Sequence, residues 1–149
     1  MGKVCAFFGH RYISAGLKPE IEKAAVKLID EKDVDTFWVG GYGEFDKVAA
    51  SVVRDIQLRR PHIRLILIAA YARQLHAYGD IFPFDGFDYP DVVECAPHKF
   101  AISARNRYMA LNADFIIAYV CCDYGGAYEA VRAARNHGKP VIEIKMPAD

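Results

Sequence analysis

Apolar residues along the chain form short continuous runs, and longer segments with a different periodicity separate these runs. Continuous apolar runs are typical of parallel strands that are covered on both faces. The sequence therefore predicts six strands, at Val4 to Phe8, Thr36 to Val39, Ile63 to Ala69, Val92 to Cys95, Phe115 to Val120 and Val141 to Ile144.

Most of the segments between the runs repeat apolar residues at spacings of three and four, as one face of an α-helix does. The apolar faces span Leu17 to Ile29, Phe45 to Ile56, Phe100 to Leu111 and Ala127 to Ala134, and the third face is the least regular. Strands that alternate with helices indicate βαβ units. We expect an α/β fold, Rossmann-like, with three αβα layers around a mostly parallel sheet.

The segment from Ala77 to His98 departs from this alternation, because it is rich in aromatic residues and interrupted by Pro83, Gly86 and Pro90. Proline and glycine at such spacing prevent a regular helix. We expect an irregular aromatic crossover there. It either packs as a loop against the edge of the sheet or forms a wall of a binding pocket.

Length, composition and charge narrow the classes of protein. The 149 residues, 53% of them hydrophobic, fit one domain, residues 1–149. Nineteen basic and nineteen acidic residues give a net charge of zero, and proteins that coat nucleic acid need clustered positive charge. We therefore expect no nucleic-acid partner. No run approaches the roughly 20 apolar residues of a membrane span, so we expect no membrane partner and a cytoplasmic location.

The four cysteines lack Cys-x-x-Cys spacing and any zinc-type spacing with histidine, so we expect neither a metal site nor a required cofactor. Cys5, Cys121 and Cys122 lie in or beside apolar runs, where thiols usually pack as small core residues. The adjacent pair Cys121 and Cys122 also allows redox activity, as the less favoured alternative.

Glycine-rich motifs follow three of the predicted strands, at the edge where an open parallel sheet binds its ligands. These motifs are Gly9-His10-Arg11, Gly40-Gly41-Tyr42-Gly43-Glu44-Phe45-Asp46 and Asp123-Tyr124-Gly125-Gly126-Ala127-Tyr128-Glu129. The second and third each lead into a helix, whose free N–H groups favour a phosphate. Each is alternatively an ordinary turn. In the second motif Glu44 and Asp46 would repel a phosphate if they pointed at it, so either carboxylate instead caps the helix or accepts sugar hydroxyls. We expect these two turns to open onto one cleft.

Two charged residues on the predicted helices are candidates for chemistry. Arg105 shares a helix face with Met109, and it is either a pocket donor or a surface charge. Glu129 falls in the first turn of its helix, where a carboxylate is favourable whatever the function. Its functional alternative is a general base or an acceptor for sugar hydroxyls. The candidate ligand-binding residues are Gly9, His10, Arg11, Gly40, Gly41, Tyr42, Gly43, Glu44, Asp46, Arg105, Gly125, Gly126 and Glu129.

Together these motifs resemble the SLOG superfamily, and most closely its YpsA-like branch. The resemblance also rests on Arg105-Asn106-Arg107-Tyr108-Met109 and on Ala113-Asp114, and it covers most of the chain. It implies a Rossmann-like fold and a nucleotide-derived ligand. The related Lonely Guy phosphoribohydrolases carry a matching arginine and a glycine-rich motif that ends in a glutamate, which places Arg105 and Glu129 on catalytic positions. That motif's leading Pro-Gly-Gly is replaced here by Cys121-Cys122-Asp123, and Gly126 stands where it has threonine.

Three functional hypotheses follow from the motifs and the resemblance. The leading one is a protein that binds, and in one version processes, a phosphorylated nucleotide-derived small molecule, with Arg105 and Arg11 neutralising the phosphate. The second is N-glycosidic cleavage of a nucleoside 5′-monophosphate, with Arg105 and Glu129 as catalytic residues. The third is a protein-interaction module without a ligand. DprA proteins share the fold, but the neutral charge and the short chain argue against that role. We also expect a homodimer, as in relatives with this fold.

Overall fold

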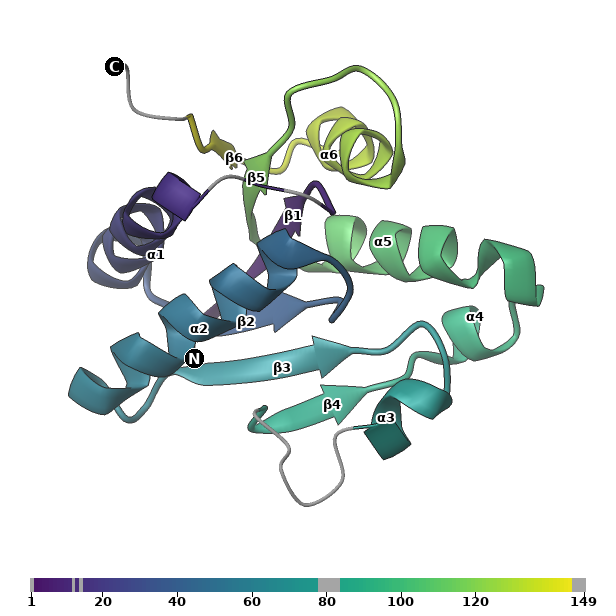
Figure 1. Cartoon of the computed structure of the whole chain (residues 1–149), viewed down its shortest axis with the longest axis horizontal. Helices are drawn as coiled ribbons and strands as arrows, with labels where there is room; N and C mark the ends of the chain where they lie inside the picture. Colours follow the sequence, from purple (N-terminus) through teal and green to yellow (C-terminus); the bar gives the residue numbers. More distant parts are fainter. Residues whose placement is uncertain (1, 12, 14, 78–83, 146–149) are drawn as a thin grey trace.

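The computed structural model describes residues 2–11, 13, 15–77 and 84–145. Its centre is a six-stranded sheet in the order β4-β3-β2-β1-β5-β6, in which every pair of neighbouring strands is parallel (Figure 1). The strands are β1 (Lys3–Gly9), β2 (Val34–Val39), β3 (Arg64–Ile68), β4 (Gly86–Asp88), β5 (Phe115–Tyr119) and β6 (Val141–Glu143). The expected Rossmann-like α/β fold is confirmed.

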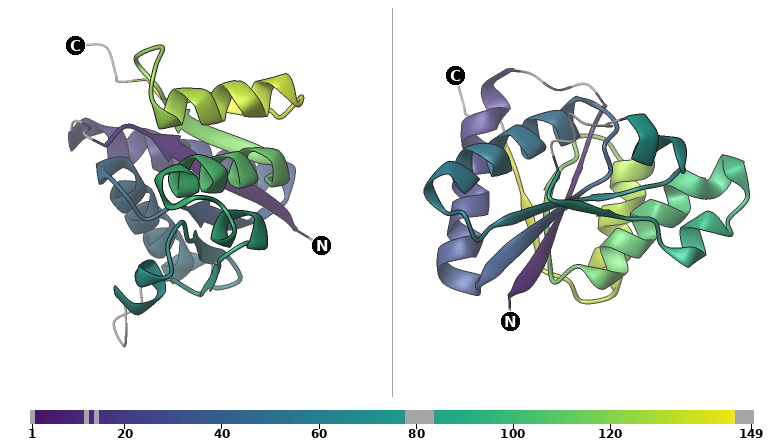
Figure 2. Two further views of the ribbon diagram at one scale, coloured as in Figure 1. Left: turned by 90° about the vertical axis from the view of Figure 1, so that its right-hand side faces the viewer. Right: turned by 90° about the horizontal axis from the view of Figure 1, so that it is seen from below.

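Two pairs of helices cover the two faces of the sheet (Figure 2, right). Helices α1 (Lys18–Lys32) and α2 (Glu44–Arg59) pack on one face, and α5 (Ala101–Asn112) and α6 (Gly126–Asn136) on the other. Each pair encloses an apolar cluster, the first around Phe7, Phe37 and Phe45 and the second around Met109 and Ile116. Burial of these side chains is the main force that holds the three layers together.

The segment before α5 differs from the expectation. Val92 to Cys95 is not a strand, because Asp91–Glu94 forms the one-turn helix α4 after Pro90, and only Val93 of that turn is buried. The edge strand is instead β4, inside the expected crossover, and it pairs with β3 from Ile66↔Gly86 to Ile68↔Asp88. The short helix α3 (Arg73–Ala77) precedes it. Part of the crossover, residues 78–83, lies outside the described residues.

The strand order creates a switch point at the carboxyl end of β1. The chain moves outward through β2, β3 and β4 on one side of β1, then returns to place β5 and β6 on the other side. Loops that leave β1 and β5 therefore diverge to opposite faces and leave a crevice between them, which is where open α/β sheets bind ligands.

Candidate functional site

A pocket of about 430 Å³ lies at this switch point. It is lined from four directions: the ends of β1 and β2, the loop before α6, and one face of α5. Its lining includes Gly9, His10, Arg11, Gly40, Tyr42, Gly43, Asp46, Arg105, Asn106, Cys122, Tyr124, Gly125 and Gly126. Both glycine turns therefore open onto one cleft, as expected from the sequence.

The first turn, between β2 and α2, uses its backbone donors within the protein. The Asp46 carboxylate accepts the N–H of Gly40 at 3.1 Å, and it also accepts the N–H groups of Tyr42 and Gly41. The N–H of Glu44, the first residue of α2, donates to the carbonyl of Arg11 at 2.7 Å. The turn is thus folded around its own carboxylate and closed by the β1 loop.

Glu44 holds the β1 loop rather than facing the pocket. Its carboxylate accepts the N–H of Ile13 at 3.1 Å, and Glu44 is not among the residues that line the pocket. Gly43 supports this contact, because its φ of 87° and an added Cβ 3.0 Å from the Cα of Arg11 leave no room for a side chain. Gly9 is equally constrained, since an added Cβ would lie 2.1 Å from the ring of Phe45.

Arg105, on α5, holds the first turn in place through a hydrogen bond to its backbone. Only 3% of the residue is exposed, and its Nη1 donates to the carbonyls of Gly40 at 2.7 Å and Ile68 at 3.2 Å. Its Nε donates to Asn106 at 2.9 Å. Gln74, the other buried polar residue among those that the structure describes, donates to the same Gly40 carbonyl at 2.8 Å. The arginine is therefore neither a surface charge nor a fully free pocket donor.

Asp46 and Arg105 form the electrostatic centre of the pocket. Loss of hydration raises the pKa of Asp46 to about 6, although Arg105 and the three backbone N–H groups favour the carboxylate. Burial lowers the pKa of Arg105, and Asp46 opposes this change. Each charge therefore makes the burial of the other less unfavourable.

The second turn, before α6, has a different character. Gly125 caps the helix with a φ of 96° and provides no side-chain cap, and an added Cβ there would meet nothing within 4 Å. The first N–H groups of any helix lack partners inside the helix. At α6 these groups belong to residues that line the pocket, beginning with Gly126 and Ala127.

Glu129 and Arg105 are not brought together. Glu129 lines a neighbouring groove of about 520 Å³ between α5 and α6, together with Arg107 and Arg132. The groove shares Gly125 and Gly126 with the switch-point pocket, but Glu129 itself does not line that pocket. Its carboxylate is 62% exposed and lies 3.8 Å from Arg132. The catalytic roles of the two residues stay predictions, and the carboxylate nearest to Arg105 in the pocket lining is Asp46, which also perturbs its pKa.

His10 connects β1 to the second turn. Its Nε2 accepts the N–H of Cys121 at 2.7 Å and lies 4.0 Å from the Cys122 sulfur. The expectation that both cysteines are core residues is wrong, because Cys121 is exposed and Cys122 is half-buried at the pocket wall. Sequence reasoning missed this contact, since residues 10 and 121 meet only when β1 and β5 pair.

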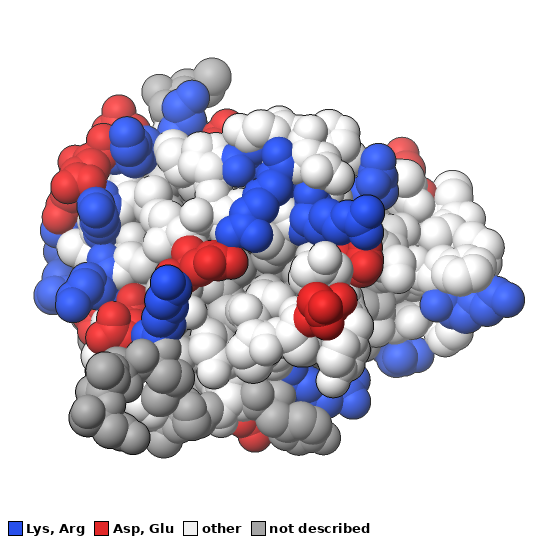
Figure 3. Space-filling view, turned by 90° about the horizontal axis from the view of Figure 1, so that it is seen from above, with Lys and Arg blue, Asp and Glu red and all other residues white. Residues whose placement is uncertain are grey.

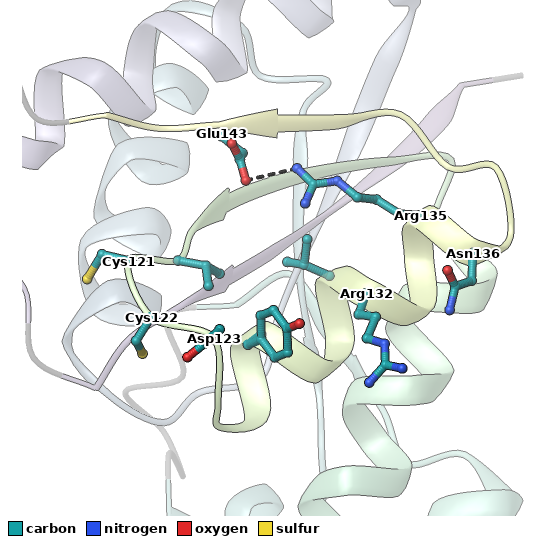
Figure 4. A pocket seen from close by; sticks show the side chains of 10 residues that line it. Cys121, Cys122, Asp123, Arg132, Arg135, Asn136 and Glu143 are labelled. Carbon is teal, nitrogen blue, oxygen red and sulfur yellow. Dashed lines mark hydrogen bonds and ion pairs between the residues drawn. The ribbon is translucent and has the colours of Figure 1, made fainter.

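A larger hollow of about 640 Å³ lies on the other side of the loop after β5, between α6 and β6 (Figure 4). Its two arginines are Arg132 and Arg135, and Arg135 pairs with Glu143 at 2.8 Å. Both acidic partners, Glu129 and Glu143, reduce the attraction for an anion. The switch-point pocket is therefore the stronger candidate, despite its smaller volume.

Charge is balanced on the face of the molecule at the top of Figure 1, where α6 and β6 lie. Seen from above, basic and acidic side chains are interspersed, and several basic ones gather near the middle of the face (Figure 3). Among the described residues, no group of three or more His, Cys, Asp or Glu side chains is arranged to hold a metal ion. No described helix has the length and apolar character to cross a membrane.

Solved structures with this fold include two DNA-processing proteins. DprA from Streptococcus pneumoniae superposes with a TM-score of 0.69 and 20% identity, over 99% of this chain and 51% of that one. DprA from Helicobacter pylori gives 0.67 and 18%, over 99% and 67%. The chain thus spans about half the length of the S. pneumoniae protein. Protein TM1055, a structural genomics target, gives 0.59 and 14%, over 93% and 72%.

These likenesses place the chain among proteins with the Rossmann-like fold of DprA. Because DprA is a member of the SLOG superfamily, the expected resemblance to that superfamily is confirmed at the level of the fold. No protein-family model and no curated protein matches the sequence.

The comparisons correct one expectation. The H. pylori structure is described for its mode of binding single-stranded DNA. This finding overturns the expectation that nucleic acid is excluded as a partner. The reasoning failed because a net charge of zero describes the whole chain, whereas phosphate recognition depends on the donors that are placed at one site.

Proposed function

We propose that the chain binds a phosphorylated nucleotide group in the switch-point pocket, with the phosphate at the N-terminus of α6. The observation that carries the proposal is the contrast between the two turns. Neither helix has a side-chain cap, but the loop N–H groups of the first turn and the N–H of Glu44 bond within the protein, whereas α6 begins at residues that line the pocket.

The phosphate end is supported by partial and full positive charge. The unpaired N–H groups and the dipole of α6 favour an anion at Gly125 and Gly126. Arg11 is exposed and lines the same pocket, so it supplies a mobile cation. Asn106 adds an amide, whose nitrogen would lie 3.2 Å from a Cβ built on Gly126. Backbone donors with one arginine are a common means of phosphate recognition.

The remaining pocket walls suit a sugar and a base. Asp46 presents a carboxylate, the group that accepts hydrogen bonds from ribose hydroxyls in related dinucleotide folds. Tyr42 and Tyr124 line the pocket, and Tyr124 is 72% exposed. Exposed aromatic rings at a pocket rim are suited to stack against a base. The same chemistry is present in a free nucleotide and in a nucleotide within a DNA strand, as the H. pylori DprA description illustrates.

Calorimetric titration with AMP, adenosine and inorganic phosphate tests the proposal. We expect AMP to bind at least about ten-fold more tightly than adenosine, because charge-assisted contacts to phosphate contribute about 1.5–3 kcal/mol. Equal affinity for AMP and adenosine would overturn the phosphate site. Release of free adenine during the titration, detected by chromatography, would move the protein to the hydrolase alternative. The homodimer and the cytoplasmic location stay predictions.

A further inference from the structure

A row of aromatic rings continues from the pocket along the carboxyl edge of the sheet. Tyr42, in the pocket wall, contacts Tyr71 edge-on with ring centroids 6.5 Å apart. Tyr71 follows β3 and contacts the ring of His98 at 4.6 Å. His98 begins the 3-10 helix His98–Phe100 that leads into α5. We call Tyr42, Tyr71, His98 and Phe100 the aromatic track.

Positive charge accompanies the aromatic track. The Arg73 guanidinium lies 4.2 Å from the centroid of Tyr71, and the Lys99 ammonium lies 5.1 Å from the centroid of Phe100. Both cations are exposed, and neither forms an ion pair with another described residue. The one-turn helix α4 that precedes the 3-10 helix carries two exposed acidic residues, Asp91 and Glu94.

The exposure of the outer end sets the aromatic track apart from the core. Phe7 and Phe37, stacked between sheet and helices, are 1% and 0% exposed, whereas Phe100 is 53% exposed. Tyr71 is half-buried and donates its hydroxyl to the carbonyl of His98 at 3.1 Å. This bond holds the 3-10 helix against the loop after β3, so Tyr71 is fixed between His98 and Arg73 while Phe100 at the outer end stays exposed.

We infer that the aromatic track binds the bases of a single-stranded DNA whose one nucleotide occupies the switch-point pocket. The inference rests on the proposed nucleotide pocket and extends it from a single nucleotide to a strand. Alternating rings and cations are the usual surface for single strands, because every base has a face that stacks and every nucleotide carries a phosphate. A mononucleotide in the pocket leaves Phe100 and Lys99 unused, whereas a strand that passes Tyr42 reaches them.

Two ligands separate the aromatic track from the pocket. Thymidine 5′-monophosphate is titrated by calorimetry, and a fluorescein-labelled oligothymidylate of about ten nucleotides is titrated by anisotropy. The oligonucleotide should bind at least about ten-fold more tightly than the monophosphate. Phe100→Ala should weaken oligonucleotide binding by about five-fold to a hundred-fold and leave binding of the monophosphate unchanged. Leu58→Ala, at an 84% exposed position on α2, is the matched control and should change neither.

The contribution of Arg73 and Lys99 is measured by the salt dependence of oligonucleotide binding. Lys99→Ala and Arg73→Ala should each reduce the dependence of oligonucleotide affinity on salt concentration, by about one phosphate contact. A DNA duplex of the same length should bind more weakly, because its bases are not free to stack.

The outcomes discriminate between the two claims. Oligonucleotide affinity equal to that of the monophosphate, or unchanged by Phe100→Ala, overturns the aromatic track and leaves the pocket intact. Absence of monophosphate binding to the folded protein overturns the pocket, while a loss of oligonucleotide affinity in Phe100→Ala still supports the track. Equal affinity for the duplex contradicts stacking, and tighter binding of oligouridylate contradicts the assignment to DNA.

Discussion

The two glycine turns look alike in sequence and differ in structure. Each follows a strand of the parallel sheet and leads into a helix that begins after a glycine with a positive φ, Gly43 or Gly125. In the first turn the N–H groups have acceptors in Asp46 and in the carbonyl of Arg11. In the second, the helix begins with Gly126 and Ala127, which line the pocket. A glycine turn before a helix therefore binds an anion only where its donors lack internal acceptors.

The largest expected effect concerns the anchor of the first turn. Arg105→Met should lower the free energy of unfolding by about 3–5 kcal/mol. The substitution leaves the Asp46 carboxylate without its compensating charge, and it removes the hydrogen bonds that the guanidinium donates to the carbonyls of Gly40 and Ile68. Chemical denaturation measures this loss. Arg107→Met, at an exposed position two residues along α5, should change stability by no more than about 0.5 kcal/mol. A variant at Arg105 with wild-type stability and lost ligand binding would instead make the arginine a ligand donor.

A smaller effect is expected for the pH dependence of ligand binding. The raised pKa of Asp46, about 6, means that its charge is lost as the pH falls from about 7 to 5. The protonated carboxyl can still hydrogen-bond a ribose hydroxyl, whereas loss of its charge removes repulsion of the phosphate, so AMP affinity should rise by about five-fold to thirty-fold. Asp46→Asn should lack this part of the pH dependence. Protonation of the phosphate itself affects the wild type and the variant alike, so the comparison separates the two effects. An identical pH profile in both proteins would exclude Asp46 as a neighbour of the bound anion.

The same shift has a consequence for stability. Because the pKa of Asp46 is higher in the folded chain than its ordinary value of 3.8, the folded protein keeps this proton to a higher pH than the unfolded chain does. The contribution of Asp46 to stability is therefore full below about pH 4 and declines as the pH rises to about 6. Thermal denaturation of wild type and Asp46→Asn across this range should show the decline only in the wild type.

The smallest effect is expected for Glu129, the carboxylate in the first turn of α6. Glu129→Gln should leave AMP affinity unchanged, because Glu129 faces the α5–α6 groove and not the pocket. Its stability should fall by about 0.3–1 kcal/mol through a weaker interaction with the helix dipole. A large loss of AMP affinity, measured by calorimetry, would restore Glu129 as a site residue.

Much of the architecture was accessible from the sequence. Continuous apolar runs correctly marked β1, β2, β3, β5 and β6, and periodic apolar faces marked the four long helices. The run at Val92 misled, because four residues of mixed character are as compatible with one helical turn after Pro90 as with a strand. β4 gave no continuous apolar run, since Gly86, Phe87 and Asp88 pair with β3 through the backbone and are half-buried or exposed.

The candidate site was likewise predictable from the sequence only in part. Glycines at strand ends were visible as motifs, and they do converge on one pocket. Which donors stay free was not visible, because it depends on contacts between distant residues such as Glu44 with Ile13 and Arg105 with Gly40. The paired roles of Arg105 and Glu129 rested on resemblance alone, and the direction of each side chain decides which hollow it faces.

The central claim, that the N-terminus of α6 binds the phosphate, is tested most directly by two matched glycine substitutions. Gly125 and Gly138 flank α6, both have positive φ values, 96° and 74°, and a Cβ added at either meets nothing within 4 Å. Alanine at Gly125, whose φ of 96° and ψ of 173° are adopted essentially by glycine alone, should cost about 1–3 kcal/mol of backbone strain, and Gly138→Ala should cost strain of the same order. Calorimetry should show AMP affinity reduced at least about ten-fold in Gly125→Ala and unchanged in Gly138→Ala. Equal AMP affinity in the two folded variants would contradict the account.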